Sequence, residues 1–242
     1  MKNVSVVVKT LRGLALGGVL VLGGCASDPE FADPRDPLED FNRAVFSFND
    51  GLDRALVKPL AQGYNAIVPG PVDRGVTNFF NNLNDVTSAV NNLLQFKIGR
   101  AVSDVSRVVV NSTVGVAGLF DVASNMNIPR YSEDFGQTLG TWGVASGPYI
   151  VLPIIGPSSG RDSVGWVVDW FTDPIYFLED NTVRWSLYGL RFVDRRSDLL
   201  NASRVLDEAA LDPYAFVRDA YLQKRQNEVF DGNPPEEAPP DF

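Results

Sequence analysis

The stretch FGQTLGTWGVASGPYIVLPIIGPSSG, at residues 135–160, contains no charged side chain, although 21% of the chain is charged. Glycine and proline recur throughout it, and both disfavour the interior of a continuous helix. Its apolar run at 149–155 is interrupted by Pro153 and is far shorter than the roughly 20 residues that a membrane-spanning helix needs. Two interpretations stay open: a buried strand or extended core loop, and irregular backbone at membrane depth beside a wet cavity.

The N-terminal residues 1–24 have the layout of a secretory signal peptide, with basic residues ahead of an apolar run rich in small side chains. The sequence LGGC at 22–25 resembles a bacterial lipoprotein processing site, where the cysteine becomes the lipid-modified N-terminus. A lone thiol in an oxidising compartment is the alternative, but Cys25 is the only cysteine and directly follows the signal run. We therefore predict a signal peptide at 1–24, lipidation of Cys25 and a tether at 25–35. In lipoproteins of this kind Ala26, rather than Asp, after the cysteine implies the outer membrane.

The chain is acidic, with a formal charge of −9, and removal of residues 1–24 makes it more negative because that segment carries only basic charges. Nucleic acid and a polybasic attraction to anionic lipid both require clustered lysine and arginine, so neither is expected. Close association with a membrane would instead depend on apolar contacts and acyl chains.

Apolar residues at spacings of three and four predict that the rest of the chain is mainly helical. The first helix is expected to begin with Asp36 as N-cap and Pro37 as its first residue, and to end before Pro59. A last helix is expected with Asp212 as N-cap. Between them lie further patterns at 72–93, 98–109 and 166–192.

These apolar stripes are expected to pack in a core, with membrane contact as the alternative. No internal repeat or domain boundary interrupts the helical patterns. We therefore predict one all-α body at 36–226, with the Gly/Pro-rich segment as its irregular part. From residue 227 the chain is acidic, rich in proline and without periodicity, which indicates a disordered tail at 227–242.

The chemistry of the chain is limited by its composition, because it contains no histidine. A Ser-His-Asp or Cys-His nucleophile is impossible, and a typical zinc site is not expected. Asp-Phe-Gly at 134–136 lacks the glycine-rich loop and catalytic loop that accompany it in kinases. Carboxylate-only catalysis stays open, but we predict no enzyme, no cofactor and no metal.

Several motifs, in order along the chain, resemble those of the MlaA/VacJ lipoprotein family. They include DPLEDFNR at 36–43, NSTVG at 111–115, EDFGQTLG at 133–140, GPY at 147–149 and DPY at 212–214, and the similarity covers residues 34–225. The resemblance implies an all-helical ring within the inner leaflet of the outer membrane, associated with a porin trimer.

In that family role, mislocalised phospholipid passes from the outer leaflet through a central channel to a soluble periplasmic carrier. Such transport maintains outer-membrane lipid asymmetry and uses neither nucleotide nor metal. The alternative is a scaffold lipoprotein that binds a porin without transport. The family-motif positions taken as hypothetical channel or partner contacts are Asp36, Pro37, Phe41, Asn42, Arg43, Asn49, Asp85, Asn111, Phe135, Gly136, Gly140, Gly147, Pro148, Pro153, Ile154, Ile155, Arg161 and Asp162.

Overall fold

The computed structural model describes residues 33–235, so the signal peptide, Cys25, the tether up to residue 32 and the tail from 236 onward lie outside the described residues. Within this part of the chain the all-α prediction is confirmed, with one small hairpin. The elements are α2 (Glu39–Leu52), a π-helical turn (Asp53–Val57), α3 (Lys58–Ile67), α4 (Gly70–Leu94), α5 (Ile98–Thr113), α6 (Val122–Asn125), α7 (Phe135–Thr141), β1 (Tyr149–Leu152), β2 (Gly156–Ser159), α8 (Gly160–Thr172), a 3-10 turn (Pro174–Phe177), α9 (Asn181–Asp198), α10 (Leu200–Ala209) and α11 (Pro213–Val229).

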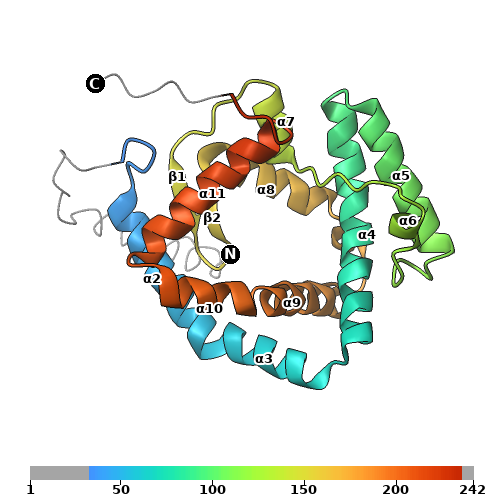
Figure 1. The fold of residues 1–242 in the computed structure, drawn as a ribbon, viewed down its shortest axis with the longest axis horizontal. Helices are drawn as coiled ribbons and strands as arrows, with labels where there is room; N and C mark the ends of the chain where they lie inside the picture. Colours follow the sequence, from blue (N-terminus) through green and yellow to red (C-terminus); the bar gives the residue numbers. More distant parts are fainter. Residues whose placement is uncertain (1–32, 236–242) are drawn as a thin grey trace, which may run out of the picture.

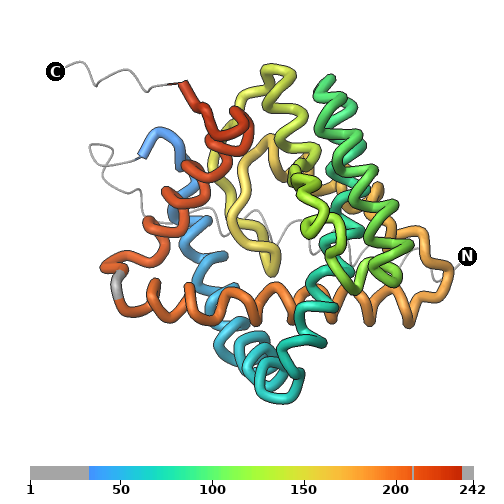
Figure 2. The backbone as a smooth tube through the Cα atoms, turned by 45° about the vertical axis from the view of Figure 1, so that its right-hand side comes forward, coloured from blue at the N-terminus to red at the C-terminus, as the bar shows by residue number. Residues whose placement is uncertain are grey.

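The helices follow one another around a ring (Figure 1). Helices α2 and α3 form its left and lower sides, α4 rises on the right with α5 and α6 outside it, and α7 and α8 close the top. Helices α9 and α10 cross the base, where α9 packs along α3, and α11 returns past the hairpin to α7. Figure 2 shows the β1–β2 hairpin extending toward the middle of this ring.

The start of the first helix differs from its prediction. Helix α2 begins at Glu39 with Leu38 as a cap that makes no side-chain hydrogen bond. Asp36 is not the N-cap, because its carboxylate is buried and accepts hydrogen bonds from Asn42 and Tyr214 instead. The sequence has the right residues for a cap, but a tertiary contact takes up the carboxylate.

The end of the first helix also differs, because Pro59 does not stop it. The N–H of Lys58 bonds to the carbonyl of Asp53, five residues earlier, which makes a π-helical turn. Pro59 then lies in the first turn of α3, where its missing N–H leaves no hydrogen bond unmade. The helical path therefore continues to Ile67 and changes direction at the π turn (Figure 1).

The 135–160 stretch forms a short helix and an antiparallel hairpin. In β1, Tyr149 and Val151 are almost completely buried, and Tyr149 packs edge-on against Tyr214. The buried-strand interpretation is therefore confirmed for this strand. The turn of the hairpin is different, since Ile154 and Ile155 are 58% and 45% exposed.

The apolar stripes face away from the protein interior, so the prediction that they pack in a core is wrong for most of their residues. On α5, Val102, Val105 and Val109 are each about half exposed, while Asp104 and Arg107 on the opposite face are buried. Helix α4 repeats this arrangement, with its asparagine-rich face inside. Burial of polar side chains is tolerated where each finds a hydrogen-bond partner, as these do across the helix pairs. The molecule is polar between its helices and apolar on many outer faces.

The last helix begins as predicted and ends later. Asp212 caps α11 by accepting a hydrogen bond from the N–H of Ala215 at 3.2 Å. The helix continues to Val229, so the predicted start of the tail at residue 227 is too early. Among residues 33–235, no helix is both long and apolar enough to cross a membrane.

Candidate functional site

Two asparagines of α2 hold the hairpin in place. The side chain of Asn42 donates to the carbonyl of Tyr149 at 2.9 Å and accepts from the N–H of Val151 at 2.8 Å. Asn49, two turns further along the same face, donates to the carbonyl of Leu152 at 3.0 Å and accepts from the N–H of Ile154 at 2.7 Å. The two amides therefore replace a neighbouring strand along the free edge of β1.

Charged side chains surround the start of α2, next to its contact with the hairpin. Buried Asp36 accepts from Asn42 at 2.8 Å and from the Tyr214 hydroxyl, and lies 3.4 Å from Nη1 of Arg218. Arg43 joins α2 to the cap of α11 through Asp212 at 2.7 Å, and its guanidinium lies 4.3 Å from the centre of the Tyr214 ring. Asp36, Asn42, Arg43 and Asn49 are thus one cluster between α2, β1 and α11.

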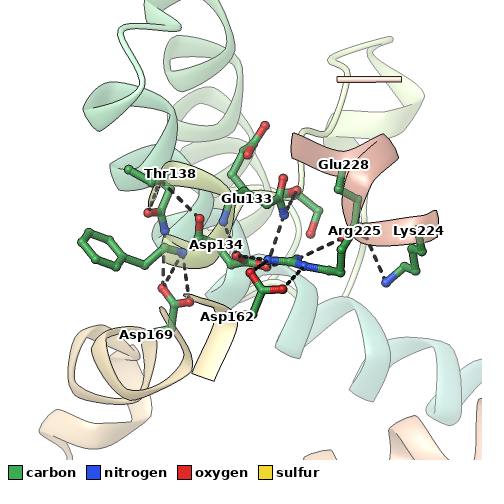
Figure 3. Close-up of polar contacts among 12 residues, drawn as sticks. Glu133, Asp134, Thr138, Asp162, Asp169, Lys224, Arg225 and Glu228 are labelled. Atoms are coloured by element: carbon green, nitrogen blue, oxygen red, sulfur yellow. Dashed lines mark hydrogen bonds and ion pairs between the residues drawn. The ribbon is translucent and has the colours of Figure 1, made fainter. Parts of the chain in front are cut away.

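A second cluster joins α7, α8 and α11 around Arg225 (Figure 3). Arg225 donates to Asp134 at 2.7 and 2.9 Å and to Asp162 at 2.9 and 3.1 Å, and it also reaches Glu228 at 3.0 Å. Tyr221 donates its hydroxyl to Asp162 at 2.7 Å. Desolvation opposes ionisation of Asp162, but the hydrogen bonds and charge of Arg225 outweigh it and lower its pKa to about 2.

Small residues allow the helices of this cluster to approach closely. A Cβ at Gly136 would lie 2.6 Å from Oδ1 of Asp162 and 2.8 Å from Nη2 of Arg225, so it would displace the ion pair of these two side chains. A Cβ at Gly140 would lie 2.8 Å from the Arg161 guanidinium and 2.9 Å from Val229. The absence of a side chain at these two glycines therefore leaves room for the side chains that join α7, α8 and α11.

A third cluster lies between α4, α5 and the segment that follows α6. Buried Asp85 receives Arg130 at 2.7 Å and Arg107 at 3.2 Å, and Arg107 also holds Asp121 with two bonds of 3.0 Å. Asn111 donates to Asp121 at 3.1 Å and accepts from the N–H of Ala123 at 2.9 Å. Arg107 also donates to the Ser124 hydroxyl at 3.1 Å, so this helix pair is joined by polar contacts rather than by an apolar core.

Two carboxyls, buried Asp104 and half-buried Asp169, have raised pKa values. Asp169 on α8 accepts the N–H of Phe135 at 3.0 Å, yet desolvation, with repulsion from Asp134, raises its pKa to about 6. Desolvation likewise raises the pKa of Asp104 on α5 to about 6, against a hydrogen bond from the N–H of Tyr131. No group of three or more potential metal-ligating side chains occurs among the described residues.

A cavity of about 790 Å³ lies beside the Arg225 cluster. The end of α7, the loop at 143–147 and the C-terminal half of α11 line it, and Gly140, Gly147 and Arg161 are part of its wall. Gly147 has a φ of +69°, and the carbonyl of Pro148 beside it accepts the N–H of Gly160 at 3.0 Å.

The predicted site residues therefore fall into separate places rather than one pocket. Pro37 and Phe41 are exposed at the start of α2, and Phe135 packs edge-on against Trp142. Pro153, Ile154 and Ile155 form the turn of the hairpin. Sequence reasoning quoted Tyr214 in a family motif but did not assign to a site the residues of α11 that complete the clusters, because their period is carried by polar and aromatic side chains. They are Tyr214, Arg218, Tyr221 and Arg225, at helical spacings of four, three and four.

A comparison with known protein families covers the residues of these clusters. The family described as MlaA lipoprotein matches residues 34–228. The chain belongs to the MlaA lipoprotein family. The match begins just ahead of Asp36 and includes all three clusters.

Individual members of the MlaA family are similar over most of their length. The Haemophilus influenzae intermembrane phospholipid transport system lipoprotein MlaA is 35% identical over 235 residues, covering 90% of each chain. The protein of the same name from Escherichia coli K12 is 35% identical over 221 residues, covering 88% of this chain and 86% of the relative. A solved structure from work on the structural basis for maintenance of bacterial outer membrane lipid asymmetry has a TM-score of 0.70 and 34% identity, and covers 82% of this chain and 99% of that chain.

Proposed function

We propose that this protein is an outer-membrane lipoprotein that removes mislocalised phospholipid from the outer leaflet and passes it through the ring to a soluble periplasmic carrier. In this proposal the ring lies in the inner leaflet, anchored by acyl chains on Cys25 and associated with a porin trimer. Lipid asymmetry of the outer membrane is maintained as a result. The chain performs no covalent chemistry, and it needs neither a cofactor nor a metal.

One observation carries the proposal: the helices expose apolar faces outward and are joined to one another by buried polar contacts. On α5, Val105 is 49% exposed whereas Asp104 and Arg107, on the other side of the helix, are 0% and 2% exposed. For a protein surrounded by water, exposed apolar surface is unfavourable and costs about 25 cal/mol per Å². Lipid removes that cost, so helices with such faces suit a position within a leaflet.

The hairpin supplies a second argument, because its turn combines exposure with backbone strain. Ile154 has a φ of +69°, a conformation that costs a β-branched residue roughly 1–3 kcal/mol. Asn49 holds that conformation by accepting the N–H of Ile154. Ile154 and Ile155 are thus presented at the end of the hairpin that extends toward the middle of the ring (Figure 2), where acyl chains would meet them.

The alternative is a scaffold that uses the same apolar faces to bind a porin and moves no lipid. A transfer assay separates the two functions. Purified lipidated protein, incorporated with its porin in vesicles that carry fluorescent phospholipid, is mixed with the periplasmic carrier. Transport predicts protein-dependent appearance of intact phospholipid on the carrier.

The product of the assay also tests the absence of catalysis. Mass spectrometry is expected to find the transferred lipid unchanged, and lyso-lipid or free fatty acid would show hydrolysis instead. Porin binding without any transfer would support the scaffold and overturn the proposal.

A further inference from the structure

Three of the four tryptophans of the chain lie together where α8 and α9 meet. Trp166 and Trp170 on α8 have ring centres 5.6 Å apart, and Trp170 lies 6.1 Å from Trp185 and 4.6 Å from Tyr188, both on α9. Trp166 and Trp185 are 41% and 60% exposed. These four rings form one surface across the two helices, which we call the aromatic corner.

The turn between the two helices continues this surface. Phe171 and Phe177 are 53% and 69% exposed, and each ring packs edge-on against Tyr176. Figure 2 shows this turn, coloured gold to orange, at the outer edge of the molecule. The exposed rings therefore lie where a partner outside the ring of helices can reach them.

Acidic residues directly follow the exposed rings. Glu179 and Asp180 are exposed within three residues of Phe177, and the carboxylate of Asp180 caps α9. Carboxylates are excluded from the hydrocarbon of a bilayer, whereas tryptophan and tyrosine favour the boundary between hydrocarbon and headgroups. The change from exposed aromatic to exposed acidic side chains within a few residues is what such a boundary requires.

Helix α9 carries positive charge beside the aromatic corner. It contains four arginines and two aspartates, in a chain whose overall charge is −9. One of these aspartates, Asp194, is buried against Tyr64 of α3 and Thr77 of α4. Arg184 donates to the carbonyl of Tyr176 at 3.1 Å, and within residues 33–235 no carboxylate lies at ion-pair distance from it. Its positive charge complements the phosphate of a lipid headgroup.

The outer face of α5 lacks this combination of aromatic and charged side chains. Its exposed apolar residues are Val102, Val105 and Val109, which are aliphatic, and Arg107 is buried on the opposite face. Aliphatic side chains suit the acyl chains of a leaflet, while tryptophan beside arginine is typical of helices that lie in the membrane interface. The two outer surfaces therefore fit different depths of one leaflet.

We propose that the aromatic corner lies among the phospholipid headgroups of the leaflet that holds the ring, with Trp166 and Trp185 at the boundary to the acyl chains and Arg184 at the phosphates. The inference rests on the proposed function, which places the ring within the inner leaflet, and adds to it the depth and orientation of the ring. That leaflet has headgroups only on its periplasmic side, so the corner faces the periplasm while α5 lies deeper.

Tryptophan fluorescence of the full-length lipidated protein, in vesicles with its proposed porin partner, tests this depth. Trp142→Phe removes the one tryptophan outside the corner, so that all emission comes from the corner. The vesicles contain phosphatidylcholine brominated either near the glycerol or near the end of the acyl chain, because bromine quenches only tryptophans close to it. Shallow bromine should quench the emission more than deep bromine, and water-soluble acrylamide should quench it less than it quenches free tryptophan.

Variants of Arg184 in the same background test the contact with phosphate. Arg184→Glu puts a negative charge at the phosphates, so quenching should shift from shallow bromine toward acrylamide, whereas Arg184→Lys should behave like the parent. The matched control is Arg204→Glu, at an exposed arginine of α10, which should leave the quenching unchanged. Thermal unfolding should show that every variant is folded.

Three outcomes would overturn the inference. Stronger quenching by deep bromine would place the corner among the acyl chains, and quenching by acrylamide alone would place it in water. Bromine quenching that appears only when the porin is left out, or only at low protein density, would identify a contact with the porin or with a second copy. Each of these results leaves transport intact, whereas failure of the wild type to transfer any lipid would overturn the proposed function and leave the measured depth unchanged.

Discussion

Two of the buried polar joints in the ring are built differently. At the joint between α2 and the hairpin, Asn42 and Asn49 contact the backbone of β1 through neutral amides. At the joint between α7, α8 and α11, Arg225 lies between the charged carboxylates of Asp134 and Asp162. Loss of a neutral hydrogen bond costs less than loss of one member of a buried charge cluster. The comparison teaches that, of these two joints, the one at Arg225 is the more rigid, and the contact of the two asparagines with the backbone of β1, which holds the hairpin, is the weaker.

The largest expected effect is at the rigid joint. Arg225→Met removes the guanidinium shared by Asp134 and Asp162 and leaves Arg161 as the counter-charge of Asp162 alone, so it should lower the free energy of unfolding by about 3–5 kcal/mol. Chemical denaturation of the purified protein measures this. Lys224→Met is the control, since Lys224 is 73% exposed and pairs with Glu228 at the surface, where about 0.5 kcal/mol or less is expected. A similar small loss for both variants would mean that the cluster does not stabilise the ring.

The weaker joint should respond less. Asn42→Ala removes the partners of one buried N–H and one buried carbonyl of β1, which should cost about 1–3 kcal/mol. Asn49→Ala should cost less, because its contacts are nearer the solvent-exposed turn. Hydrogen exchange at Val151 and Ile154 should increase in the matching variant, and unchanged exchange would show that the amides do not hold the hairpin.

The rigid joint should also depend on pH through Asp169, whose pKa is raised to about 6 by desolvation. A raised pKa stabilises the fold where the carboxyl is protonated, and that contribution is lost as the pH rises from about 4 through 6. The wild type should therefore lose stability over this range relative to Asp169→Asn, in which the group does not titrate. Glu179→Gln, an exposed position, should follow the wild type. Parallel stability curves for the wild type and Asp169→Asn would contradict the prediction.

The smallest effect on stability is expected at the turn of the hairpin. Ile154→Asp should change the free energy of unfolding by less than about 0.5 kcal/mol, because Ile154 is 58% exposed and aspartate tolerates a positive φ better. Lipid transfer to the carrier should nevertheless fall, because the charge lies where acyl chains would pass. Ile154→Ser, polar but uncharged, should transfer more than Ile154→Asp. A folded Ile154→Asp variant with unimpaired transfer would remove the turn from the mechanism.

The sequence predicted which segments are helical because helical spacing is a local property. It did not predict which face is buried, since Val102, Val105 and Val109 would have the same spacing in a core as in lipid. The role of Asn42 could not be predicted for a similar reason: its partners Tyr149 and Val151 are over a hundred residues away, and no local pattern indicates them. Arg225 was missed because a buried arginine is recognisable only once Asp134 and Asp162 are placed beside it.

The central claim is that the apolar outer faces contact lipid, and a spin label at Val105 tests it most directly. Cysteine variants at Val105 and Lys224 are labelled in protein in which the proposed lipid modification blocks Cys25, and are reconstituted in bilayers with the proposed porin partner. The label at Val105 should be relaxed by oxygen, which concentrates in lipid, and protected from a water-soluble nickel chelate. The label at Lys224 should show the reverse, since that side chain is 73% exposed on α11. A label at Val105 that is as accessible to the chelate as the one at Lys224 would contradict the account.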